Sequence, residues 1–231
     1  MIAVVDYGVG NLFSLVCSLK YIGLDAVVTS DADVLRRADG IILPGVGAFG
    51  DAREKLRATG LEPVLREEAQ KGKPFLGICL GMQVAVIEFA RNVLGIERAT
   101  SSEFEPDSAH AVIHLMPDQE GKQMGGTMRL GAYPCRIADD SLMKAAYGTD
   151  FVSERHRHRY EFNNDYRSSV EREGMRITGT SPDGLLVETV EIPSNDFFVG
   201  VQFHPEFKSR PNRAHPLFRE FVAASLRHKK N

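Results

Sequence analysis

A cysteine between two glycines is the residue of this chain whose type and setting most clearly could do chemistry. The segment Gly77-Ile78-Cys79-Leu80-Gly81 overlaps the apolar run 74–78, and a helical pattern begins directly after it. A strand, a sharp turn and a helix in that order form a nucleophile elbow, which holds a reactive side chain at the apex of the turn. Free N–H groups and the dipole at a helix N-terminus favour a thiolate over a thiol. We therefore predict that Cys79 is a nucleophile.

The motif His204-Pro205-Glu206 contains the partners that a cysteine nucleophile needs. It follows the apolar stretch 197–203, which has the pattern of a buried strand. An imidazole can act as base for a thiol, and a carboxylate can orient the imidazole, so we predict His204 as base and Glu206 as its orienting group. Each motif alone is more often structural. Their joint occurrence at the ends of two strands favours catalysis.

Attack on an amide carbonyl also requires N–H donors that stabilise the oxyanion. One predicted donor is the backbone amide of Leu80 at the start of the helix. The others are Val46 and Gly47, in the glycine loop that begins at Gly45 and follows the apolar stretch 40–43. Open α/β sheets place their sites at the carboxyl ends of such strands. Together these residues predict an acyl-transfer enzyme that uses a cysteine.

Strand and helix patterns alternate along the first hundred residues, which predicts an α/β fold with a mostly parallel sheet flanked by helices. The expected strands there are 2–6, 26–29, 40–43 and 75–78, and the expected helices are 11–22, a short helix capped by Ser30 and ending at Arg37, 48–58, 61–70 and 81–94. We expect loops over about 100–126. Added antiparallel strands are expected at 128–137, 176–180 and 185–190, with a hairpin turn at 181–184, and a last helix at 214–228. We expect one domain over residues 1–231.

The composition is that of an ordinary globular domain. The 231 residues include 28 basic and 31 acidic side chains, a net charge of −3, which gives no electrostatic case for nucleic acid or an anionic membrane as a partner. No run of about 18 apolar residues is present to span a membrane. Three widely spaced cysteines form neither a disulfide framework nor a zinc motif, so we expect a cytoplasmic location, no metal and no cofactor.

Other histidines and cysteines have weaker signals. The run 154–159 alternates, which predicts a strand with arginines 155, 157 and 159 on one face and histidines 156 and 158 on the other. This run favours contact with a charged substrate end or a domain interface over a metal site. Cys17 and Cys135 are predicted to be packing residues, and His215 and His228 are predicted to lie on the surface.

Three motifs together resemble the class I glutamine amidotransferases: Pro-Gly-Val-Gly at 44–47, Gly-Ile-Cys-Leu-Gly-Met-Gln at 77–83 and Phe-His-Pro-Glu at 203–206. The resemblance implies that L-glutamine is hydrolysed through a thioester at Cys79. It also implies that the ammonia passes to a synthase domain or subunit, either an amidoligase or a cyclase.

The resemblance changes along the chain. Residues 1–83, notably 6–12 and 44–50, resemble the glutaminase subunit of imidazole glycerol phosphate synthase, an enzyme of histidine biosynthesis. Residues 84–231 resemble the glutaminase domain of CTP synthase, an enzyme of pyrimidine biosynthesis, through segments 88–95, 126–131, 154–161 and 202–207. The two meet at 77–83, a motif that both families share. The chain is therefore interpreted as a hybrid, whose origin as a natural, engineered or misassembled sequence stays open.

The CTP synthase resemblance implies glutamine contacts at Gln83, Glu103 and Arg159, and the glycine loop adds Gly45. Glu103 can accept from the α-ammonium group, and Arg159 can pair with the α-carboxylate. By coverage the implied ammonia acceptor is that of CTP synthase, UTP. Three alternatives stay open: the imidazole glycerol phosphate synthase subunit, which the start at Met1 matches, a non-catalytic module, and a thiol hydrolase of γ-glutamyl peptides.

Overall fold

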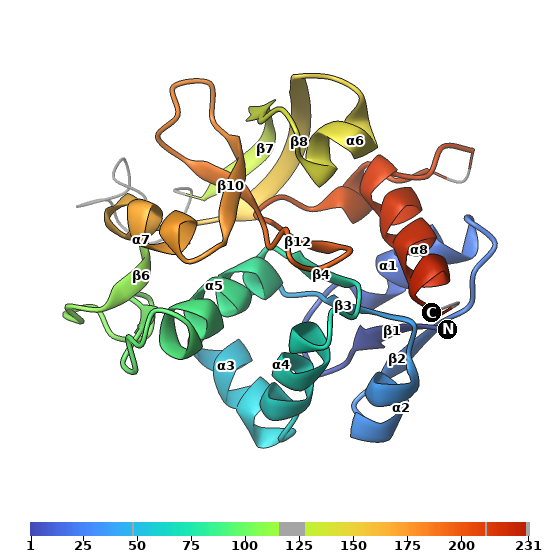
Figure 1. Ribbon diagram of the computed structural model, residues 1–231, viewed down its shortest axis with the longest axis horizontal. Helices are drawn as coiled ribbons and strands as arrows, with labels where there is room; N and C mark the ends of the chain where they lie inside the picture. Colours follow the sequence, from blue (N-terminus) through green and yellow to red (C-terminus); the bar gives the residue numbers. More distant parts are fainter. Residues whose placement is uncertain (48, 116–127, 211, 230–231) are drawn as a thin grey trace.

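The computed structural model describes residues 1–47, 49–115, 128–210 and 212–229. One nine-stranded sheet organises this part of the chain (Figure 1). Its parallel half consists of β2 (Ala26–Thr29), β1 (Ile2–Val5), β3 (Gly40–Leu43), β4 (Phe75–Ile78) and β12 (Phe198–Val201), in that spatial order. The antiparallel half continues with β11 (Val187–Glu191), β10 (Arg176–Thr180), β7 (Arg129–Ile137) and β8 (Phe151–His158). The predicted mixed sheet is confirmed.

Helices cover both faces of this sheet. One apolar core joins it to α2 (Ala32–Arg37), α3 (Phe49–Ala58), α4 (Glu62–Gln70), α5 (Leu80–Asn92) and α7 (Arg167–Arg172). The other core joins it to α1 (Leu12–Lys20), α6 (Leu142–Tyr147) and α8 (Pro216–His228). Figure 1 shows α3, α4 and α5 together on one side, away from α1 and α8. Successive side chains of a strand point to opposite faces of the sheet, and helices cover both faces, so the central strands are apolar at every position. In β1, Ile2 and Val4 join one core, and Ala3 and Val5 join the other.

A small second sheet lies where loops were expected. It consists of β5 (Thr100–Ser101), β6 (Ala111–Leu115) and β9 (Tyr160–Phe162), in that order. The prediction of loops was therefore wrong for β5 and β6, while residues 116–126 lie outside the described residues. Both strands are very short, and the structure stabilises them by pairing and by burying Val112 and Ile113 in the core.

Two further local predictions were wrong. Ser30 does not cap α2; Asp31 does, and its carboxylate accepts the backbone N–H groups of Asp33 and Val34. These two hydrogen bonds are the main cause of a lowered pKa for Asp31. His215 is buried rather than on the surface, because its ring accepts the N–H of Leu217 at the start of α8 and lies against Glu154. The turn at 181–184 does join the antiparallel strands β10 and β11, as predicted.

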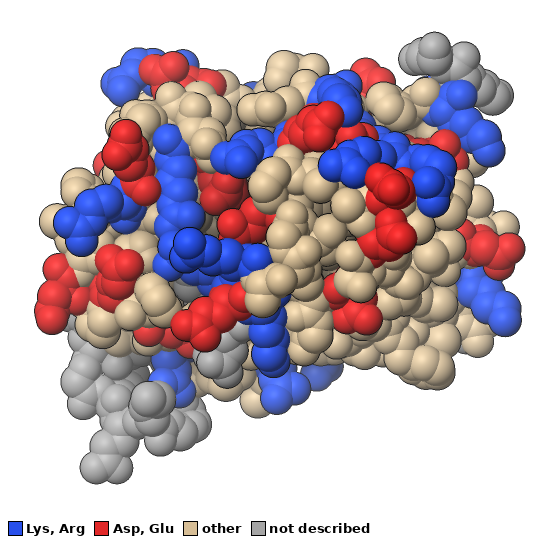
Figure 2. All heavy atoms as spheres, turned by 90° about the horizontal axis from the view of Figure 1, so that it is seen from below, with Lys and Arg blue, Asp and Glu red and all other residues tan. Residues whose placement is uncertain are grey.

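The surface shows no dominance of one charge sign on the face seen in Figure 2, where basic and acidic side chains lie side by side among uncharged ones. This mixture accords with the small net charge of −3. Among the helices of the described residues, none has the length and apolar character needed to cross a membrane.

Candidate functional site

Cys79 lies at a strained turn between β4 and α5. Its backbone has φ 52° and ψ −105°, a region that residues with a side chain rarely adopt and that is associated with functional sites. Two close approaches require the flanking glycines: a Cβ on Gly81 would lie 1.9 Å from the carbonyl oxygen of Leu43, and one on Gly77 would lie 2.9 Å from the backbone of Gly81. The Cys79 N–H donates to the carbonyl of Val201 at 2.7 Å, so β12 holds the turn in place. The geometry is that of a nucleophile elbow.

His204 and Glu206 follow the end of β12, the strand adjacent to β4. Nδ1 of His204 and Oε1 of Glu206 are 2.9 Å apart, and both side chains are buried. The backbone N–H of His204 donates to the carbonyl of Arg155 on β8, and its ring stacks on Phe207 with a centroid distance of 4.7 Å. A proton on Nδ1 donated to Glu206 leaves Nε2 as the nitrogen that can exchange a proton with Cys79.

The charge state of His204 is set by two opposing influences. Burial alone would lower its pKa, but the interaction with the Cys79 side chain and the hydrogen bond with Glu206 outweigh burial and raise the pKa to about 10. Nε2 is buried and makes no hydrogen bond of regular geometry with any described residue, so its interaction with Cys79 is electrostatic rather than a well-formed hydrogen bond. The pair is therefore suited to a thiolate beside an imidazolium, in which His204 keeps a proton for a leaving amine.

The glycine loop packs directly against the elbow. A Cβ on Gly45 would lie 2.4 Å from Cβ of Leu80, so only glycine permits this approach. Val46 is half-buried and Gly47, with φ 102°, is exposed, so the predicted donors lie just beyond the contact with Leu80.

Tyr7 was not predicted from the sequence. Its hydroxyl donates to the carbonyl of Pro44 at 2.5 Å and fixes the start of the glycine loop. Burial, together with the charge of Cys79, raises the pKa of Tyr7, which places its hydroxyl near Cys79. Its position just after β1, on the edge of the sheet that carries the site, was the signal available in the sequence.

The predicted glutamine contacts come from segments far apart in the sequence. Glu103 and Arg159 both act electrostatically on the hydroxyl of Tyr160, where, after burial, Glu103 raises the pKa and Arg159 lowers it. Both charged side chains therefore lie near the Tyr160 hydroxyl, and their charges are opposite. Gln83 is buried in the first turns of α5, and its Nε2 donates to the carbonyl of Tyr160 at 2.9 Å.

Gln202 is a second residue that the sequence did not single out. It lies just after β12 and is fully buried. Its Nε2 donates to Sγ of Cys79 at 3.6 Å, and its Oε1 accepts from Nε2 of Gln83 at 3.1 Å. The signal was its position two residues before His204, because a strand places residues i and i+2 on the same face.

The comparisons with known proteins agree with this geometry. The model of the family described as "Glutamine amidotransferase class-I" matches residues 3–224. The chain belongs to the class I glutamine amidotransferase family. The enzymatic character and the fold class predicted from the sequence are thereby confirmed at the level of the family.

Individual relatives show which members of the family this chain is similar to. CTP synthases of Staphylococcus aureus strains JH9 and Newman are each 48% identical over 224 residues, which is 96% of this chain and 41% of theirs. The chain thus spans less than half the length of these relatives. The solved structure of the Trypanosoma brucei CTP synthase glutaminase domain with bound acivicin has a TM-score of 0.85 at 33% identity, over 98% of this chain and 93% of that one. A Thermoplasma acidophilum protein named as a GMP synthase subunit, at 17% identity and a TM-score of 0.69, shares the fold.

The match to CTP synthase covers 96% of the chain, so it includes most of residues 1–83 and is not confined to residues 84–231. The resemblance of the N-terminal part to the glutaminase subunit of imidazole glycerol phosphate synthase stays a prediction, and so does the interpretation as a hybrid.

The alternating run on β8 has the predicted arrangement. Arg155 and Arg157 are exposed, whereas His156 and His158 are buried; Arg159 lies past the end of the strand. Burial, followed by the charge of Arg129, lowers the pKa of His156 to about 2 and that of His158 to about 3, so both rings are neutral.

The two neutral rings form a short chain of hydrogen bonds that ends at the carbonyl of Tyr160. His158 Nδ1 lies 3.1 Å from the carbonyl of Tyr160, which only accepts, so His158 carries its proton on Nδ1. Its Nε2 then accepts from Nδ1 of His156 at 3.0 Å. Within the described part of the chain, no group of three or more His, Cys, Asp or Glu side chains is arranged to hold a metal ion.

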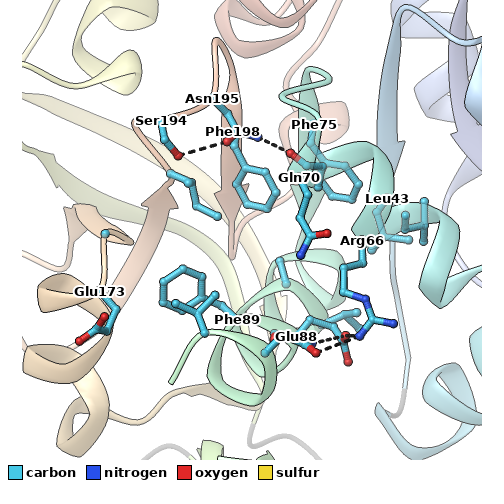
Figure 3. A pocket seen from close by; sticks show the side chains of 18 of the residues that line it. Leu43, Arg66, Gln70, Phe75, Glu88, Phe89, Glu173, Ser194, Asn195 and Phe198 are labelled. Carbon is cyan, nitrogen blue, oxygen red and sulfur yellow. Dashed lines mark hydrogen bonds and ion pairs between the residues drawn. The ribbon is translucent and has the colours of Figure 1, made fainter. Parts of the chain in front are cut away.

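A cavity of about 710 Å³ lies apart from the elbow, between α4, α5 and the starts of β4 and β12. Figure 3 shows the rings of Phe75, Phe198 and Phe89 around it, with an ion pair between Arg66 and Glu88 at its edge. None of the predicted site residues lines it. The cavity therefore belongs to the packing of α5 on the sheet rather than to the candidate site.

Proposed function

We propose that this chain hydrolyses L-glutamine to glutamate and ammonia, acting as one glutaminase domain over residues 1–231. The observation that carries the proposal is the strained elbow at Cys79, just after β4 and beside the end of β12, after which His204 is bonded to Glu206. A buried thiol, an imidazole and a carboxylate in this order are the groups that amide hydrolysis through a thioester needs.

The proposed reaction proceeds in two steps. Sγ of Cys79 attacks the side-chain amide carbon of glutamine, and the oxyanion is held by N–H groups of Leu80 and of Val46 or Gly47. The imidazolium of His204 gives its Nε2 proton to the departing ammonia, which leaves a γ-glutamyl thioester. Water, deprotonated by the now neutral His204, then attacks the thioester and releases glutamate, which restores the thiolate of Cys79 and the imidazolium of His204.

We propose that substrate binding uses the opposite charges near Tyr160. Glu103 would accept from the α-ammonium group of glutamine, and Arg159 would pair with its α-carboxylate. Gly45 and Gln83 would border the side chain of the substrate beside the elbow. The shared effect of Glu103 and Arg159 on Tyr160 supports this arrangement, because it puts both charges at one place.

The proposed partner is a synthase that consumes the ammonia, with UTP as the acceptor. The 48% identity with CTP synthases supports this choice. We also propose a cytoplasmic location, since Cys79 is a free thiol and a thiolate nucleophile needs a reducing compartment.

Glutamate release from glutamine tests the activity. The wild-type chain should turn over, and Cys79→Ala should lower kcat by about 10⁴-fold or more, as removal of a nucleophile does. Cys17→Ala, at a half-buried free thiol on α1, is the matched control and should keep full activity. Equal activity of the wild type and Cys79→Ala would refute the proposal.

A second candidate differs only in the acceptor. The loop Pro44-Gly45-Val46-Gly47 favours the glutaminase subunit of imidazole glycerol phosphate synthase, whose partner is a cyclase. Titration with each purified synthase partner distinguishes the two. Stimulation of glutamate release by the amidoligase part of a CTP synthase supports the first acceptor, and stimulation by the cyclase alone supports the second.

A further inference from the structure

Gln202 touches the nucleophile but lies outside the triad and the oxyanion hole. Its side chain is fully buried, and its backbone N–H donates to the carbonyl of Glu188 at 2.8 Å, so its position on the sheet is fixed. The amide Nε2 lies 3.6 Å from Sγ of Cys79, within the range of an N–H donor to sulfur. The question is whether the amide or the carbonyl end of Gln202 faces the sulfur.

One backbone carbonyl decides the orientation. The carbonyl oxygen of Tyr160 can only accept, and Gln83 lies 2.9 Å from it, so Gln83 must present its Nε2 there. The second hydrogen on that nitrogen then donates to Gln202 at 3.1 Å, which requires Oε1 of Gln202. The remaining end of Gln202, its NH₂ group, therefore faces Cys79. A flipped amide would set two NH₂ groups against each other.

The carbonyl of Tyr160, from which this orientation of Gln202 is derived, is itself fixed by neighbouring groups. The carbonyl of Tyr160 also accepts from Nδ1 of His158 at 3.1 Å, so its two lone pairs are both engaged. Tyr160 begins β9, which pairs with β6, and His158 ends β8. Because this carbonyl can only accept, it determines the direction of the hydrogen bonds from Gln83 to Gln202 and from Gln202 to Cys79.

We propose that Gln202 is a catalytic residue, which donates a hydrogen bond to Sγ of Cys79 and so favours the thiolate before it attacks. The proposal rests on the proposed glutaminase function and adds to it a donor that acts on the sulfur rather than on the oxyanion. A hydrogen bond to an ionised partner is stronger than one to a neutral partner, so the Gln202 amide binds the thiolate better than the thiol.

Two titratable groups of the described residues interact with Cys79 besides this donor: Tyr7, after β1, and His204, after β12. His204 in turn interacts with Glu206 on its own segment and with the two histidines 156 and 158 of β8. Since these groups remain in Gln202→Leu, which adds no charge, a change in the reactivity of Cys79 in that variant reports the loss of the amide donor.

The test measures alkylation of Cys79 by iodoacetamide as a function of pH, with each cysteine followed by mass spectrometry. Gln202→Leu removes both the donor and the acceptor. Gln202→Glu keeps an oxygen that accepts from Gln83 but, when ionised, presents an acceptor to the sulfur. Cys17 in the same chains is the internal control, because it is a free thiol with no hydrogen bond to Gln202 or Gln83.

We expect both variants to slow alkylation of Cys79 near neutral pH by about 10-fold to 100-fold, the range for a hydrogen bond to a charged group. The rise in rate should move to higher pH, with Cys17 unchanged. A Gln202→Glu chain that reacts like the wild type would overturn the proposal, because Gln202 would then serve only as an acceptor for Gln83.

A second variant keeps the test decisive if Gln202 variants do not fold. Gln83→Met removes the side-chain donor that orients Gln202 and keeps the backbone hydrogen bond from residue 83 to the Cys79 carbonyl, so it should move the pH dependence of alkylation in the same direction by a smaller amount. An unchanged profile would contradict the proposal. Alkylation needs no glutamine turnover, so a wild-type chain that alkylates as expected but releases no glutamate would refute the proposed function alone.

Discussion

The two ends of one strand pair differ sharply in this molecule. β4 and β12 are parallel neighbours in register, with Phe75 opposite Phe198 at the start and Ile78 opposite Val201 at the end. At the start, the two phenylalanine rings stack with centroids 5.2 Å apart beside the cavity of about 710 Å³. Just past the end lie Cys79 and the polar groups that surround it.

The difference shows how precisely apolar packing and hydrogen bonds each position side-chain atoms. Apolar burial depends on area and not on direction, so the phenylalanine end can leave space between α5 and the sheet. Hydrogen bonds depend on both distance and angle, so the other end places single atoms, such as Nδ1 of His204 against Oε1 of Glu206. α5 joins the two regions, since it begins at Leu80 and carries Phe89 to the cavity.

The largest expected effect breaks the polar end alone. His204→Ala should lower kcat for glutamate release by about 10⁴-fold, because triad members act as a unit, and should also lower the midpoint of thermal unfolding, because buried Glu206 loses its partner. Steady-state kinetics and thermal unfolding of the same samples check both parts. Activity within 10-fold of wild type would show that the proton is moved by another group.

The opposite change breaks the apolar end alone. Phe198→Ala should lower the free energy of unfolding by about 3–5 kcal/mol, through lost burial and an enlarged cavity. Denaturant titration measures the loss, and Phe198→Leu, which keeps most of the volume, should lose much less. Below its unfolding transition the Ala variant should retain turnover; a selective loss of kcat in a folded sample would mean that the two ends are not independent.

The pH dependence sharpens the description of the polar end. His204 has its pKa raised to about 10 from an unfolded value of 6.5, so its imidazolium stabilises the fold fully below pH 6.5 and this contribution is lost as the pH rises through about 10. The alkaline fall of kcat/KM should accordingly lie near pH 10. Glu206→Gln removes one of the hydrogen bonds that raise the pKa and should move this fall toward neutral pH. A fall at about pH 6.5 in the wild type would contradict the assignment.

A smaller effect concerns the strain stored at the elbow. Because Cys79 has φ 52°, Cys79→Gly should be more stable than Cys79→Ala by about 1 kcal/mol, although neither has a thiol. Chemical denaturation of the two variants measures the difference. Equal stabilities would mean that the positive φ costs little in this setting.

The smallest expected effect fills the cavity. Ala85 on α5 lines it, and Ala85→Leu should raise the melting temperature by a few degrees, about what 1 kcal/mol of added burial gives. The kcat should stay that of the wild type, as measured in parallel. A lowered melting temperature would show that the cavity, despite its volume, has no room at this position for the larger leucine side chain.

The sequence predicted the parts of the molecule that depend on long apolar runs and strong turn signals. The bounds of β3 and β4 and the turn at 181–184 follow from residue type alone, and the types of Cys79, His204 and Glu206 predicted where a triad would form. The structure brings these three side chains to one edge of the sheet, although their catalytic roles stay a proposal.

The remaining features depend on contacts that no local pattern contains. β6 is only five residues long and is stabilised by pairing with distant β9. His215 is buried because it meets Glu154 from another strand, and Asp31 outcompetes Ser30 as a cap through the position of its carboxylate. The donor role of Gln202 depends on the carbonyl of Tyr160, far away in the sequence.

The most direct measurement traps the intermediate on the nucleophile. The full chain is mixed with glutamine, quenched in acid within milliseconds to seconds, digested and analysed by mass spectrometry. We expect a γ-glutamyl group on the peptide that contains Cys79, absent from Cys79→Ala and from the peptide that contains Cys17. Glutamate release without any adduct on Cys79, or with an adduct on another residue, would contradict this expectation.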